Sequence, residues 1–195
     1  MQISLTEIFY SCFVSPKKAI QQIVVSPSLS SSILVVVFSL FAHTLSVLIL
    51  LNFPGDVASK LLIYGFPLRL MVTVLVWIIL AAVLHLMAEV LGGEGRAGTL
   101  FILFGYSLLP LNLSLPLSFI ARGVSHPLIY LLGMIVILVW IIYNQIQGIK
   151  QVYRFELGQA VFTWLTPFLL GGTIILTSIA SLIIGTITTV VALLG

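Results

Sequence analysis

The sequence predicts an all-α polytopic membrane protein, a bundle of five transmembrane helices with an N-terminal amphipathic helix at the membrane interface. Two observations support this fold class. Of the 195 residues, 61% are apolar and only 7% are charged, whereas soluble domains carry about 25% charged residues. The eight basic and five acidic residues also fall between long apolar runs. A water-soluble fold is therefore excluded, because so few charges cannot cover its surface.

Residues 1–30 form the predicted N-terminal interfacial segment. Ser4 and Glu7 have the spacing of a capping box, and apolar residues follow at helical intervals. Ser15 and Pro16 offer an N-cap and a proline at the first position of a second short helix. We expect these helices to lie parallel to the membrane, with a disordered tail as the alternative. No cleaved signal peptide is expected, because the basic residues do not precede a short apolar run.

Charged residues delimit the predicted spans, because an ionised side chain at the bilayer centre costs at least about 2.5 kcal/mol. An uncharged run of about 19 residues rises about 28 Å as a helix, close to the hydrocarbon thickness of about 30 Å. The domain from 31 to 195 therefore contains five predicted spans, which are 33–51, 70–90, 100–120, 128–146 and 168–194.

The basic residues of the loops predict the orientation of the chain. With the N-terminus in the cytoplasm, five basic residues are cytoplasmic and three lie outside. The cytoplasmic set is Lys17, Lys18, Arg96, Lys150 and Arg154, and the outer set is Lys60, Arg69 and Arg122. We therefore expect a cytoplasmic N-terminus and a C-terminus on the opposite side.

Two groups of ionisable residues in the first two spans are candidate polar or ligand-binding positions. His43 lies near the middle of the first span, on the same helix face as Ser39 and Ser46. A hydrogen bond to a neighbouring helix and a proton or metal relay are both open for it. His85 and Glu89 are one turn apart near the cytoplasmic end of the second span. They could form a proton-carrying pair, but a metal site is not predicted because no third ligand is evident; an ion pair of Glu89 with Arg96 is expected instead.

The stretch from 91 to 116 combines a glycine turn with an interrupted third span. Gly92, Gly93 and Gly95 predict a flexible turn without the spacing of a phosphate-binding loop. Pro110 and Pro116 remove backbone donors, so a kinked or broken helix is expected. The candidate polar residues that could satisfy the freed carbonyls or bind a ligand are Tyr106, Ser107 and Asn112. Such a broken helix fits a substrate site of a transporter as well as a purely structural role.

Small residues recur every fourth position in the fifth predicted span. Thr177, Ser181 and Gly185 belong to this stripe, which lets helix backbones approach closely. We expect the stripe to pack against another helix. Its partner is open between the same chain and a second copy, so a homo-oligomer is one of the expected assemblies.

The rest of the sequence excludes several classes of function. The single cysteine, Cys12, allows no internal disulfide and no cysteine metal site. A net charge of +3 rests on so few groups that nucleic acid is not an expected partner. No cluster of acid, base and nucleophile is evident. We therefore expect no enzyme activity, no metal and no cofactor.

Three stretches of the sequence together resemble the Yip1 family of five-span membrane proteins. Ser15 to Ala19 look like the proline-containing segment that precedes the first span of the family. His85, the glycine turn after Leu91 and the Gly105-Tyr106-Ser107 stretch with Pro110 are similar to its glycine loop and third span. The third stretch resembles the link between its fourth and fifth spans and contains Trp140, Gly148, Ile149, Val152, Tyr153 and Ala160.

This resemblance implies a non-enzymatic membrane protein with a cytoplasmic N-terminus. Eukaryotic relatives act in the Golgi and endoplasmic reticulum with Rab GTPases, but this chain lacks their long N-terminal region and DLYGP motif. A short prokaryotic member in a plasma membrane is therefore expected. The predicted function is a membrane scaffold or adaptor with the lipid bilayer and membrane or cytoplasmic proteins as partners. The alternative is a small proton or divalent-cation transporter or channel with a polar path through the bundle.

Overall fold

The structure, a computed structural model, describes residues 15–172 and residue 181. These residues form helices joined by short turns, with no strand among them. Four helical segments are long and apolar enough to cross a membrane, and they contain the first four predicted spans. The fifth predicted span, 168–194, lies mostly outside the described residues and stays a prediction, although residues 157–172 are helical.

The four segments differ in regularity. The first is the continuous helix α3 (Leu29–Leu51), and the fourth is the continuous helix α8 (Pro127–Tyr153). The second joins α4 (Gly55–Lys60), a π-helical turn (Leu61–Gly65) and α5 (Phe66–Val90). The third joins α6 (Ala97–Ser107), a 3₁₀ helix (Leu109–Leu113) and α7 (Ser114–Gly123).

The second span begins earlier than the sequence predicts. The helix already starts at Gly55, whereas the span was expected to begin only after the charge of Arg69. Pro67 has no N–H for the carbonyl of Ile63, and the π turn lies directly before this proline. The π turn therefore accommodates the missing hydrogen bond, and the helix continues through the proline. The fourth span is likewise longer than predicted, since α8 continues to Tyr153.

The third span lies in the middle of the bundle. In its most apolar window 56% of the residues are buried, against 11% to 33% in the other three segments. α6 packs against α3, α5 and α8, and α7 packs against α3 and α8. The other spans turn most of their apolar side chains outward, as helices in contact with lipid do.

A stripe of buried serines attaches α3 to the third span. Ser32, Ser39 and Ser46 follow one another at intervals of seven residues and are fully buried. The Ser32 hydroxyl donates to the Ile102 carbonyl at 2.7 Å, and that of Ser46 donates to the Ser114 carbonyl at 2.8 Å. Small polar residues of this kind let membrane helices approach and bond across the contact.

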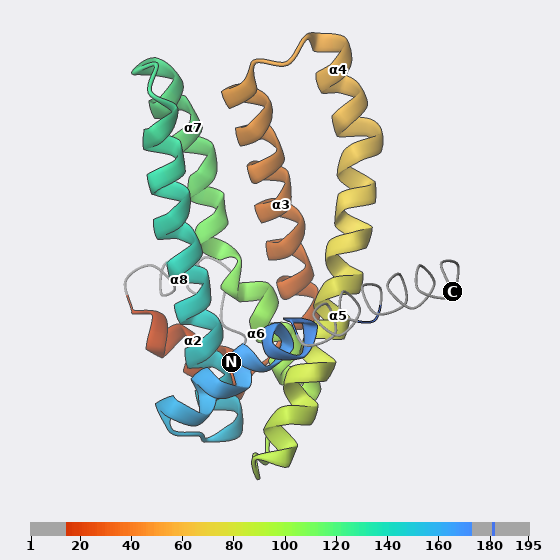
Figure 1. Cartoon of the computed structure of the whole chain (residues 1–195), viewed down its shortest axis with the longest axis vertical. Helices are drawn as coiled ribbons and strands as arrows, with labels where there is room; N and C mark the ends of the chain where they lie inside the picture. Colours follow the sequence, from red (N-terminus) through yellow and green to blue (C-terminus); the bar gives the residue numbers. More distant parts are fainter. Residues whose placement is uncertain (1–14, 173–180, 182–195) are drawn as a thin grey trace, which may run out of the picture.

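Successive spans run in opposite directions, so their connections gather at two ends (Figure 1). The lower end in Figure 1 holds α2 (Pro16–Val25), the turn between α5 and α6, and the end of α8. The upper end holds the turns that follow α3 and α7. We call the lower end the α2 end; it contains the candidate site.

α2 is the described part of the predicted N-terminal segment. It begins after Ser15 with a proline in its first turn, although the Ser15 side chain makes no capping bond. Ala19 and Ile23 are buried, in a cluster with residues of α3 and α6, whereas Lys18 is exposed. The position of this helix at a membrane surface stays a prediction, and residues 1–14 lie outside the described part.

Candidate functional site

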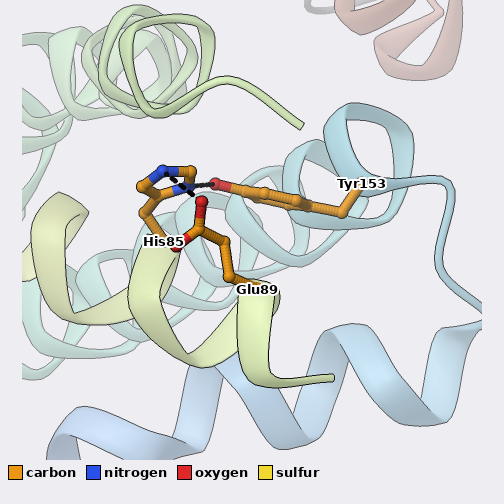
Figure 2. A network of polar contacts seen from close by, with 3 residues as sticks. All are labelled: His85, Glu89 and Tyr153. Atoms are coloured by element: carbon orange, nitrogen blue, oxygen red, sulfur yellow. Dashed lines mark hydrogen bonds and ion pairs between the residues drawn. The ribbon is translucent and has the colours of Figure 1, made fainter. Parts of the chain in front are cut away.

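Three side chains form a polar chain at the α2 end (Figure 2). His85 and Glu89 come from the last turns of α5, and Tyr153 is the last residue of α8. The Nδ1 atom of His85 lies 2.7 Å from the Tyr153 hydroxyl, and its Nε2 atom lies 3.3 Å from the Glu89 carboxylate. The imidazole thus links a phenol to a carboxylate.

The chemistry of the two partners assigns the protons of this chain. An ionised carboxylate only accepts hydrogen bonds, so Nε2 of His85 carries the proton that faces Glu89. In a neutral imidazole Nδ1 then accepts the hydroxyl proton of Tyr153. The Glu89 side chain is 57% exposed and that of His85 only 23%. The carboxylate therefore reaches solvent or head groups, whereas the Tyr153 ring closes the inner end.

A glycine turn follows α5 and packs against Tyr153, the inner one of these three side chains. α5 ends in a Schellman motif, in which the Gly93 N–H donates to the Ala88 carbonyl at 2.8 Å and the Gly92 N–H donates to the Glu89 carbonyl at 2.9 Å. Gly92 has a φ of 82°, which a residue with a side chain adopts at a cost. The chain then turns back toward the end of α8.

Gly93 and Gly95 allow the turn to touch the aromatic residues at the end of α8. A Cβ on Gly95 would lie 2.6 Å from Cδ1 of Tyr153, and one on Gly93 would lie 2.8 Å from Cζ of Phe155. The Tyr153 and Phe155 rings stack with centroids 5.7 Å apart. The glycines are thus required for close packing, and the turn is held in place by it.

The expected ion pair between Glu89 and Arg96 is wrong within the described residues. Glu89 contacts His85 one turn earlier, and Arg96 instead becomes the N-cap of α6. The glycine turn packs against Tyr153, and Arg96, which directly follows the turn, lines a groove with Arg154.

This groove, which we call the arginine groove, has a volume of about 250 Å³. α2, the glycine turn, α6 and the end of α8 all contribute to it. Its lining residues are Val24, Glu94, Gly95, Arg96, Thr99, Gln151, Val152, Tyr153 and Arg154. Two guanidinium groups and one carboxylate make it a polar surface of mixed charge.

The other candidate residues lie in separate contacts inside the bundle. Asn112 donates to the Ser39 hydroxyl and to the Leu109 carbonyl, each at 2.9 Å. The Ser107 hydroxyl donates to the Phe104 carbonyl at 2.6 Å, and Tyr106 is buried. His43 is half-buried in α3, and its Nδ1 atom has no hydrogen-bond partner in the described structure. None of these residues lines the arginine groove.

The remaining predicted positions are placed as follows. Pro110 lies in the 3₁₀ helix that interrupts the third span, and Pro116 lies in the first turn of α7. Ser181 is helical and exposed, whereas Thr177 and Gly185 lie outside the described residues, so their role in helix packing stays a prediction. Within the described residues, no three metal-ligating side chains lie together.

A family comparison connects this arrangement to known sequences. The family model of the Yip1 domain matches residues 10–179, which include α2, all four described spans and the glycine turn. The chain belongs to the Yip1 domain family. This confirms the resemblance seen in the sequence. No curated protein and no solved structure matches the chain.

Tyr153 and Phe155 of this Yip1 domain were not predicted as site residues. His85 and Glu89 are four positions apart, so their spacing indicates a pair. Tyr153 lies 68 residues after His85, and no spacing rule predicts that contact. One signal was available: the aromatic residues Tyr153 and Phe155 follow the fourth predicted span on the same predicted side of the membrane as the glycine turn.

Proposed function

We propose that this Yip1 domain protein is a non-enzymatic membrane scaffold that docks a partner protein at the arginine groove. The carrying observation is that one groove joins α2, the glycine turn, α6 and α8. A partner bound there would contact all of these segments at once. Exposed residues of both charges, Glu94, Arg96 and Arg154, suit a polar segment of another protein.

We further propose that the α2 end faces the cytoplasm, in the plasma membrane of a prokaryote. Five of the eight basic residues lie at the α2 end or in its connections. The other three lie in the upper halves of the spans or in the upper turns. A majority of basic residues favours the cytoplasmic side. The same end also carries Glu89, Glu94 and Glu156, but acidic residues have little weight in this rule.

The separation of the polar residues supports a scaffold over a transporter. A transport path requires the candidate side chains to converge on one cavity. His85 instead bonds with Tyr153 and pairs with Glu89 at the end of the bundle, whereas Asn112 bonds with Ser39 between two helices. Each set satisfies its own polar groups, which is what structural contacts do.

Site-specific photo-crosslinking in native membranes tests the docking proposal. We expect a photoreactive residue at Thr99, in the groove, to form a discrete adduct with a second protein. The same residue at Ser59, which is exposed on α4, forms none and is the matched control. Combining Arg96→Ala with Arg154→Ala should lower the adduct yield about fivefold or more, equivalent to about 1 kcal/mol of binding.

Equal adducts from Thr99 and Ser59 would contradict the proposal, since they would reflect random collisions in the membrane. An adduct at Thr99 that is insensitive to the loss of both arginines would also contradict it. Expression and the elution volume of each variant in detergent show that the fold is retained.

A further inference from the structure

Arg69 is a charged residue between two apolar stretches of the sequence, and its guanidinium lies near His43 and Tyr130. Its Nη1 atom donates to the Thr44 hydroxyl at 3.1 Å. Thr44 lies seven residues before the end of α3, so the guanidinium lies about 10 Å inside that end of the helix. Residues 45–51 of α3 and residues 61–68 before Arg69 carry no charge. The cation is therefore within the apolar layer and not at its edge.

The hydrogen-bonding capacity of Arg69 is largely unused within the described residues. A guanidinium has five N–H donors, and Thr44 supplies one acceptor. The Thr44 hydroxyl uses its own proton on the Leu40 carbonyl at 2.8 Å, which fixes it as an acceptor toward Arg69. No carboxylate of residues 15–172 pairs with the guanidinium. Charged groups in the membrane normally face a partner or water, because their insertion costs about 2.5–3.5 kcal/mol at the helix centre.

A pocket of about 180 Å³ opens beside Arg69 between α3 and the second span. The guanidinium and the Thr44 hydroxyl are polar, and the other walls are apolar. The lining residues are Thr44, Val47, Leu48, Leu61, Gly65, Phe66 and Arg69. Phe66 is held by an edge-on contact with Phe41, with ring centroids 5.5 Å apart. Gly65 belongs to the π turn, and the absence of a side chain there helps to leave the space open.

We propose that this pocket binds one anionic phospholipid, with the lipid phosphate on Arg69. Arginine presents parallel donors that match phosphate oxygens, and the match is stronger in an apolar environment. The apolar walls accept the glycerol and the first acyl carbons, which a free phosphate ion lacks. A zwitterionic lipid fits less well, because its ammonium group would lie near the guanidinium with no acidic residue in the pocket.

Lipid retention measured by native mass spectrometry tests this site. The purified full chain is equilibrated in detergent with phosphatidylglycerol or with phosphatidylcholine. We expect one phosphatidylglycerol to stay bound and phosphatidylcholine to be lost. Arg69→Gln should weaken phosphatidylglycerol binding about tenfold or more, and Arg69→Lys should weaken it less because it keeps the charge without the paired donors.

Two further variants separate the pocket from its charge. Gly65→Leu keeps Arg69 but fills the pocket, so it should also lose the lipid; its Cβ would meet only the Leu61 side chain, at 3.4 Å and beyond. Lys60→Gln removes an exposed cation outside the pocket, so this variant should retain the lipid. Because Gly65→Leu leaves the Arg69 contacts intact, this variant still tests whether the pocket binds the lipid if Arg69→Gln does not fold.

Three results would overturn the proposal. The first is equal retention of both lipids by the unaltered chain. The second is equal loss of phosphatidylglycerol in Lys60→Gln and in the pocket variants, which would indicate attraction by net charge alone. The third is displacement of the lipid by excess inorganic phosphate, which would indicate a site for a free anion.

Discussion

Replacing Gly105 by leucine is expected to destabilise the bundle by about 3 kcal/mol, at the upper end of the usual cost of overpacking a core. A Cβ at this position would overlap the Ser32 hydroxyl and would lie 2.7 Å from the Trp77 ring. Neither neighbour can move easily. Ser32 donates to the Ile102 carbonyl, and the Trp77 ring is stacked on Phe101 with centroids 4.0 Å apart.

The midpoint of thermal unfolding in detergent measures this effect. Gly98→Leu is the matched control, because Gly98 lies in the same helix α6 and a Cβ there would have no neighbour within 4 Å. We expect that control to change stability by no more than about 0.5 kcal/mol. If both variants lowered the midpoint equally, the close approach of α6 to α3 and α5 would be wrong.

Tyr153→Ala is the substitution with the second large expected effect, a loss of about 3–5 kcal/mol as for other buried aromatic residues. Tyr153 is only 3% exposed. Its ring packs under Gly93 and Gly95, and its hydroxyl bonds with His85. Removing the ring therefore takes away the surface against which the glycine turn packs. It also leaves the Nδ1 atom of His85 without its hydrogen-bond partner.

Two variants separate the contributions of the ring and the hydroxyl. Tyr153→Phe keeps the ring and loses the bond to His85, which should cost about 1 kcal/mol. Tyr143→Ala, at a residue that is 41% exposed on the same helix, should cost far less than Tyr153→Ala. Thermal unfolding and limited proteolysis of the glycine turn measure both effects. Equal losses at Tyr143 and Tyr153 would contradict the packing described here.

The spans were predictable because membrane insertion imposes a simple rule on sequence. Charged residues are costly in hydrocarbon, so apolar runs between them indicate helices that cross the bilayer. The rule fails where a charge finds a local partner. The second span was expected to begin after Arg69, yet its helix already includes this residue, whose guanidinium bonds with Thr44. The Yip1 resemblance was also accessible, since it depends on short motifs in a fixed order.

Contacts between distant segments were less accessible. Asn112 and the proline-rich stretch stood out as polar or irregular, but no local pattern shows that Asn112 bonds with Ser39. The intervals of seven residues between Ser32, Ser39 and Ser46 were the signal for the buried stripe. The sequence pattern had instead placed His43 with Ser39 and Ser46, because residues three or four positions apart share a helix face. Such a face is wide enough to include residues that do not reach the contact.

Cysteine accessibility is the most direct test of the central claim, that four spans bring α2, the glycine turn and the segment after α8 to one side of the membrane. Cys12 is first replaced by serine, and single cysteines are introduced at exposed positions. The positions at the α2 end are Lys17, Glu94 and Glu156, and those at the upper end are Asp56 and Ser125. A membrane-impermeant maleimide is applied to intact cells and then to opened membranes. The structure predicts that the first three cysteines behave alike and opposite to the other two, and the proposed orientation predicts labelling of only positions 56 and 125 in intact cells. Labelling of positions 94 and 156 from opposite sides would contradict the account.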